Sequence, residues 1–87
     1  MAISSLEFDE LLGAFRWSEA GIEGPFRLVL LGEDYRPITT IDGIERSPWK
    51  PTDELRLSLK PTTTYHAHVL AVVNDRTVKS PMVRFVW

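Results

Sequence analysis

Alternation of apolar and polar residues is the main pattern along this chain, and it is typical of strands that bury one face. The clearest case is Thr64–Val73 (TYHAHVLAVV). On a strand, Tyr65 and every second residue after it would line one face, while Leu70 and Val72 would lie on the other. The pattern therefore predicts a strand whose tyrosine face packs in the core.

Similar alternation predicts strands in five further segments. The first segment is also compatible with a helical turn, but Leu6 and Phe8, followed by Gly13 as a break, favour an edge strand. In the fourth segment three leucines would point inward. In chain order the segments are Leu6–Leu12, Ala14–Ser18, Phe26–Leu31, Glu54–Leu59 and Pro81–Trp87.

Two connections carry residues that favour turns. Asn74-Asp75 tolerates a left-handed backbone, and it predicts a hairpin between Thr64–Val73 and Pro81–Trp87 with a loop longer than two residues. Gly32-Glu33-Asp34 predicts a second turn, directly after the strand Phe26–Leu31.

The stretch Tyr35–Pro51 has the weakest pattern. Ile38–Ile41 and Ile44–Arg46 are compatible with two short strands joined by a turn at Asp42-Gly43. Two prolines lie close to Trp49, and each lacks a backbone donor. Trp49 is therefore predicted to anchor a connection against the core rather than to lie in a paired strand.

Short strands at close intervals, without a long helix, predict an all-β sandwich or barrel. The 87 residues are enough for one domain, which would span residues 1–87. Apolar residues make up 44% of the chain and charged residues 25%, as in ordinary globular proteins. The chain has no cysteine, so a disulfide, a thiolate metal ligand and a thiol nucleophile are all excluded.

The segment LKPTTTYHAHVLA, which begins at Leu59, resembles the signature of fibronectin type III domains. The family pattern is Leu-x-Pro-x-Thr-x-Tyr followed by alternating small apolar residues. The resemblance implies a tyrosine corner, in which the ring of Tyr65 enters the core and its hydroxyl bonds to nearby backbone. The matching positions are Leu59, Pro61, Thr63, Tyr65, Val69 and Ala71.

The resemblance extends over about Phe15–Trp87. It implies a core position for Trp17 on the second strand, and it places Ser80-Pro81 and Phe85 in the last strand. The implied fold is a two-sheet antiparallel sandwich of about seven strands. The first strand lacks the Pro-rich opening that is usual in the family. The sequence Arg-Gly-Asp is absent, so integrin binding is not implied. Similar domains occur in bacterial surface proteins and in phage structural proteins.

The charge pattern argues against nucleic acid as a partner. Twelve acidic and ten basic residues give a net charge of −2, and no two basic residues are adjacent, whereas nucleic-acid binding needs clustered Lys and Arg. The longest apolar run, Val69–Val73, is far shorter than the ~20 residues of a spanning helix, so no membrane insertion is expected. The first residues lack the features of a signal peptide. An extracytoplasmic location is expected only for a module excised from a longer protein, and the compartment stays open.

Motifs for chemistry are absent from the sequence. His66 and His68 would share a strand face and could grip a metal together, but a tight site needs a third ligand, and two polar residues on a sheet face are the favoured interpretation. Glu33-Asp34 lacks the spacing of a calcium loop and is interpreted as a solvated turn. There is neither a nucleophile elbow nor a Gly-rich phosphate loop. We therefore expect a non-catalytic protein without a cofactor or a metal.

One predicted face is unusually apolar for a face turned to solvent. If Tyr65 points inward, Leu70 and Val72 point outward, beside the outward residues of two other strands. Exposed apolar area of this kind tends to mark a protein contact or self-association; the alternative is a face covered by a loop or by the N-terminal segment. The predicted face comprises Arg27, Val29, Leu31, His66, His68, Leu70, Val72, Met82, Arg84 and Val86.

The sequence thus favours protein–protein interaction or structural spacing. The chain would be a module of a bacterial surface or signalling protein, or else a stand-alone structural subunit such as a phage virion component. A rival interpretation is carbohydrate binding, with Trp49 or Trp87 stacking on sugars.

Overall fold

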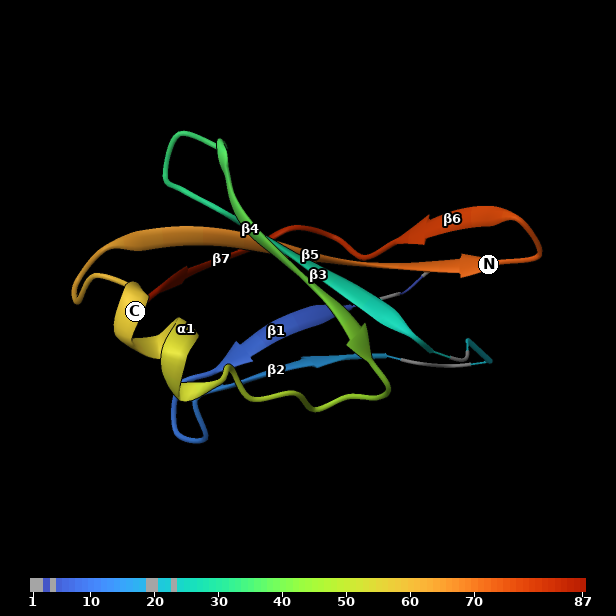
Figure 1. Cartoon of the computed structure of the whole chain (residues 1–87), viewed down its shortest axis with the longest axis horizontal. Coiled ribbons are helices and arrows are strands. Elements are labelled where there is room, and N and C mark those ends of the chain that lie inside the picture. Colours follow the sequence, from blue (N-terminus) through green and yellow to red (C-terminus); the bar gives the residue numbers. More distant parts are fainter. Residues whose placement is uncertain (1–2, 4, 19–20, 23) are drawn as a thin grey trace.

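A computed structural model describes residues 3, 5–18, 21–22 and 24–87, and its strands form two antiparallel sheets (Figure 1). In the smaller sheet β1 (Leu6–Asp9) pairs with β2 (Ala14–Trp17). The larger sheet has five strands in the order β4-β3-β5-β6, and β7 also pairs with β5. Its strands are β3 (Phe26–Leu31), β4 (Pro37–Ile44), β5 (Thr64–Val73), β6 (Arg76–Lys79) and β7 (Val83–Val86). The prediction of a mostly antiparallel all-β chain is confirmed.

The core lies between the two sheets. Phe15 and Trp17 of β2 face the larger sheet, where the ring of Phe15 lies 5.1 Å from that of Phe85, and the ring of Trp17 lies 5.4 Å from that of Phe26. The predicted inward residues of β5 are all buried except the last, which is partly buried. A single apolar cluster therefore joins both sheets, and it includes Phe15, Trp17, Phe26, Leu28, Leu30, Tyr65, Ala67, Val69, Ala71 and Phe85.

Three predicted strands are present with nearly the predicted bounds, and a fourth begins at Leu6 as predicted but ends at Asp9 instead of Leu12. β5 and β3 coincide with their predictions, and β2 ends one residue early. The first segment, whose pattern is also compatible with a helical turn, forms the strand β1, which ends at Asp9. The carboxylate Oδ1 of Asp9 accepts hydrogen bonds from the backbone N–H of Leu11 (3.0 Å) and Leu12 (3.2 Å), which tightens the turn into β2.

The predicted strand Glu54–Leu59 is wrong, because this segment forms the helix α1 (Asp53–Ser58). The hydroxyl of Thr52 caps the helix by accepting from the backbone N–H of Leu55 at 3.3 Å, and two acidic residues in the first turn suit the helix dipole. Leu55 is partly buried and Leu59 is buried, four residues apart. Leu57 is 87% exposed, so the leucines follow a helical period here and not the period of a strand.

The predicted hairpin has the wrong partner, because an unpredicted strand, β6, follows β5 directly. Val73 pairs with Arg76, so Asn74 and Asp75 form a two-residue turn, with φ of 51° and 63°. The pairing of β6 with β5 ends before Ser80. The hydroxyl of Ser80 accepts a hydrogen bond of 2.8 Å from the backbone N–H of Val69 in β5. The predicted last strand is shortened to β7, which pairs with the first part of β5 along the same edge as β6.

The turn predicted at Asp42-Gly43 is also wrong. One strand, β4, runs through these residues and pairs with β3 with two irregularities in register. Gly43 has φ of 74°, which glycine adopts without strain, so the strand continues past the irregularity instead of reversing. Trp49 forms an isolated bridge with Phe15 through two backbone hydrogen bonds of 2.9 Å. The connection is thus anchored at Trp49, although the bridge adds pairing that was not predicted.

Tyr65 has the geometry of a tyrosine corner. The ring is buried, and its hydroxyl accepts a hydrogen bond of 2.8 Å from the backbone N–H of Lys60. This bond ties the segment between α1 and β5 to the core. The orientation on which the predicted contact face depends is therefore present.

Candidate functional site: the outer face of the larger sheet

The outer face is the side of the five-stranded sheet that points away from the core. Pairing of β3 with β5 places Arg27 beside Leu70 and Val29 beside His68. These side chains alternate with the buried residues Phe26, Leu28 and Leu30 along β3. The register thus brings predicted contact residues from two strands into adjacent positions on one face.

The other strands extend this face. Pairing of β7 with β5 places Arg84 beside His66, and Met82 lies in the connection between β6 and β7. The most exposed apolar side chains among the predicted residues are Val72 (68%), Val86 (51%) and Met82 (44%). Several apolar side chains among the predicted contact residues are therefore accessible to solvent.

One end of the outer face is covered by the loop between β3 and β4. The ring of Tyr35 stacks on His66 with 4.2 Å between centroids, and His66 itself is buried. Nδ1 of His66 lies 2.9 Å from the carbonyl oxygen of Gly32 and donates to it, because a carbonyl only accepts. Leu31, the neighbour of His66 across the sheet, is buried too. At this end the loop thus covers His66, as the alternative interpretation proposed.

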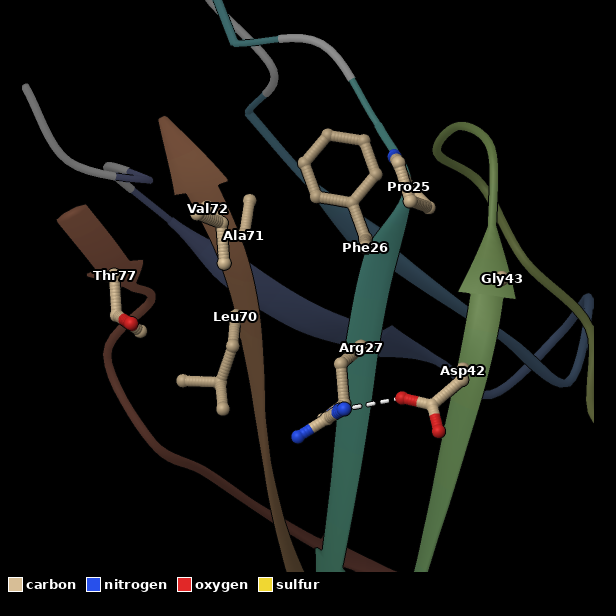
Figure 2. Close-up of a pocket in the computed structure, with 9 residues that line it drawn as sticks. All are labelled: Pro25, Phe26, Arg27, Asp42, Gly43, Leu70, Ala71, Val72 and Thr77. Carbon is tan, nitrogen blue, oxygen red and sulfur yellow. Dashed lines mark hydrogen bonds and ion pairs between the residues drawn. The ribbon is translucent and has the colours of Figure 1, made fainter. Parts of the chain in front are cut away.

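The opposite end of the outer face holds a shallow open depression of about 390 Å³ (Figure 2). Arg27 forms an ion pair with Asp42 of β4 across the depression's rim, and Figure 2 shows the rest of its guanidinium turned toward the side of Leu70. Asp42 and Thr77 were not predicted as contact residues. A turn was expected at Asp42-Gly43 where β4 runs through, and no strand was expected where β6 carries Thr77. The lining comprises Pro25, Phe26, Arg27, Asp42, Gly43, Leu70, Ala71, Val72 and Thr77.

Within residues 3, 5–18, 21–22 and 24–87, no group of three or more His, Cys, Asp or Glu side chains is arranged to hold a metal ion. Asp34 is engaged in its turn, where Oδ1 accepts from the N–H of Arg36 at 3.2 Å and Oδ2 pairs with the Arg36 guanidinium at 3.3 Å.

Burial lowers the pKa of His68 below its usual value of 6.5, and repulsion from Lys79 lowers it further. The unfolded chain therefore takes up this proton first as the pH falls. We expect the stability of the fold to decrease as the pH falls through 6.5 and to stop decreasing, for this group, below the folded pKa. His68 lies in the middle of the outer face, so its protonation also places a charge among apolar side chains.

Lys79→Gln is expected to raise the pKa of His68 without restoring it to 6.5, because burial is the larger cause. Titration of the imidazole followed by NMR measures this directly. Lys60→Gln is the control, because Lys79 is the lysine whose charge lowers the pKa of His68. An unchanged His68 titration in Lys79→Gln would show that the two groups do not interact.

Trp49 and Trp87 lie at the margin of the core. Both are partly buried and packed against the core cluster. The ring of Trp49 stacks on Phe15 at 6.4 Å, and that of Trp87 lies 6.0 Å from Phe8. Part of each indole surface is therefore already in contact with protein.

Comparison of the chain with protein-family models, with curated proteins and with solved structures finds no match. Among the described residues, no helix has the length and apolarity needed to cross a membrane.

Proposed function

We propose that this chain is a fibronectin type III-like β-sandwich that acts without catalysis, as a protein-interaction or spacer module. The fold proposal is supported by two sheets packed on a common core, by the buried Trp17 on the second strand and by the Tyr65 hydroxyl bonded to the Lys60 N–H. Helix α1 is a departure from a sandwich built of strands alone.

The observation that carries the functional proposal is the accessible apolar area of the outer face. Val72 is exposed at the depression, and Val86 is exposed where β7 pairs with the other end of β5. The depression beside Leu70 and Val72 is lined mainly by apolar residues. Exposed apolar patches on a soluble domain tend to mark protein contacts. The ion pair of Arg27 and Asp42 gives the patch a polar rim, as protein interfaces have.

The double substitution Leu70→Thr and Val72→Thr tests this function. Threonine is β-branched and has a high strand propensity, and it removes apolar contact area, so the fold is expected to survive. We expect the dissociation constant for a protein partner, or for self-association, to rise by about tenfold or more, since every 1.4 kcal/mol corresponds to a factor of ten. Sedimentation measures self-association, and circular dichroism checks the fold.

Leu11→Thr is the matched control, because it makes the same kind of change at a 98% exposed position in the turn between β1 and β2, away from the outer face. Unchanged binding by the double variant would argue against the outer face as the contact surface. If the double variant unfolds, the single substitution Val72→Thr, at the more exposed of the two positions, replaces it in the same measurement.

A module of a bacterial surface or signalling protein and a stand-alone structural subunit, such as a virion component, would both use such a face. The parent reading frame distinguishes them: a longer frame indicates a module, and a stop codon after Trp87 indicates a subunit. Carbohydrate binding is less favoured, because the rings of Trp49 and Trp87 pack on Phe15 and Phe8.

A further inference from the structure

The strand β4 forms one edge of the larger sheet. It stands first in the order β4-β3-β5-β6, and β3 is its pairing partner among the residues that the structure describes. Figure 2 shows β4 at the rim of the sheet, with β3 on one side of it. Because the backbone groups of successive residues in an antiparallel strand point to opposite sides, every second residue of β4 directs its N–H and C=O away from β3. These groups form a row with which another extended strand can pair.

Other edges of the two sheets carry charged residues on short strands. β6 and β7, of four residues each, lie along the opposite edge of the larger sheet, and their basic residues are Arg76, Lys79 and Arg84. β1, also of four residues, lies at an edge of the smaller sheet and carries Glu7 and Asp9. Charges on a short edge strand oppose pairing with another chain. These edges are therefore poorer templates for pairing than β4.

The segment Ile38–Ile41 of β4 has no such charges. All four of its residues are β-branched, which favours strand pairing. Ile38 is 51% exposed, and Thr40 is exposed as well. Irregularities in the register with β3 lie on both sides of Thr39–Ile41, so the regular part of β4 is centred on Thr40. Pro37, which lacks an N–H, is the first residue of the strand and leaves this regular part complete.

The main chain of this edge determines the chemistry of its partner, because a row of backbone donors and acceptors is matched by an extended strand. A second copy of β4 fits when a two-fold axis passes through Thr40, which then lies opposite Thr40 of the second copy. On the core side of the sheet, Thr39 lies opposite Ile41. On the outer side, Ile38 lies opposite Asp42. Threonines thus meet at the centre, and no like charges within this segment lie directly opposite each other.

We propose that the chain forms a symmetric dimer in which the β4 strands of two copies pair antiparallel about Thr40. The larger sheets of the two copies then join into one continuous sheet. A two-fold contact uses the same edge of both copies, so association ends at the dimer. This contact goes beyond the proposed function, because it uses main-chain groups at the sheet edge and not the apolar depression of the outer face.

Opposite charges at position 40 test this register. Thr40→Lys and Thr40→Glu, each by itself, place two like charges directly opposite each other in the dimer. The dissociation constant of each variant should therefore rise about fivefold or more. An equimolar mixture places lysine opposite glutamate, so dimers should return in the mixture. Sedimentation velocity at increasing concentration measures the mass in each sample, and circular dichroism checks that each variant is folded.

Thr77→Lys is the matched control, because Thr77 is an exposed threonine of β6 at the opposite edge of the same sheet. This variant should dimerise like the wild type. Amide hydrogen exchange followed by NMR gives a second readout that needs no substitution. The alternate amides of β4 that point away from β3 should exchange more slowly as the concentration of the wild type rises. A contact through the depression would leave their exchange unchanged.

Several outcomes would overturn the dimer, and they separate it from the proposed function. A wild type that stays monomeric up to about 1 mM overturns the dimer but leaves binding of the outer face to another protein open. Self-association that Thr77→Lys abolishes and both Thr40 variants keep excludes the edge contact and supports the depression instead. A mixture that stays monomeric while each Thr40 variant has lost association excludes the two-fold register. If the Thr40 variants unfold, exchange of the β4 amides that does not change with concentration overturns the proposal.

Discussion

Replacing Phe15 with alanine is expected to lower the free energy of unfolding by about 3–5 kcal/mol. The ring is almost fully buried and lies at the junction of the two sheets, 5.0 Å from Phe8 and 5.1 Å from Phe85. Its removal leaves a cavity that these neighbours cannot fill without moving. Because a small domain has about 5–15 kcal/mol of total stability, this is a large share of it. Urea unfolding followed by circular dichroism measures the loss.

Leu57→Ala is the matched control for this prediction. It removes an apolar side chain of comparable chemistry from a position that is 87% exposed, so it should change the unfolding free energy by less than about 0.5 kcal/mol. A loss below about 1 kcal/mol in Phe15→Ala would mean that the smaller sheet does not pack on the larger one as described.

Replacing Tyr65 with phenylalanine should cost about 1–3 kcal/mol of unfolding free energy, although it removes a single oxygen atom. The ring keeps its place in the core, but the part-buried N–H of Lys60 loses its acceptor at 2.8 Å. The substitution therefore isolates the hydrogen bond from the packing of the ring. Thermal or urea unfolding of the variant beside the wild type gives the difference.

Tyr35→Phe is the control for this second prediction, because Tyr35 is 60% exposed and its ring, not its hydroxyl, stacks on His66. We expect it to change stability by less than about 0.5 kcal/mol. Equal stability of Tyr65→Phe and the wild type would show that the corner contributes nothing, and it would weaken the fibronectin type III interpretation, which depends on this residue.

The predicted face illustrates how far local pattern reaches. Alternation along β5 and β3 predicted which side chains point outward, and the registers Arg27 to Leu70 and Val29 to His68 place them together. Whether such a face is open to solvent depends on distant segments. The loop that carries Tyr35 covers His66, and β4 supplies Asp42 at the depression, and neither contact has a signature in the sequence of β5.

The errors fall where local preferences were closely balanced. Leu55, Leu57 and Leu59 alternate as they would on a strand, yet Thr52 with the two acids after it also begins a helix, and packing of Leu55 and Leu59 on the core decided for α1. The capping residue Thr52 is visible in the sequence, but a cap by itself does not decide between a helix and a strand. Asp42-Gly43 favours a turn by itself, but pairing with β3 carries the strand through it.

The sequence alone determined the antiparallel all-β class, the bounds of β3 and β5 and the inward orientation of Tyr65, because a strand with one buried face repeats every two residues whatever its partners are. Only the tertiary structure decided which edges pair, that a helix replaces a strand before β5, and that the outer face is covered at one end and hollowed at the other. These outcomes depend on contacts between residues far apart in the chain, and the free energy of such contacts is absent from any local pattern.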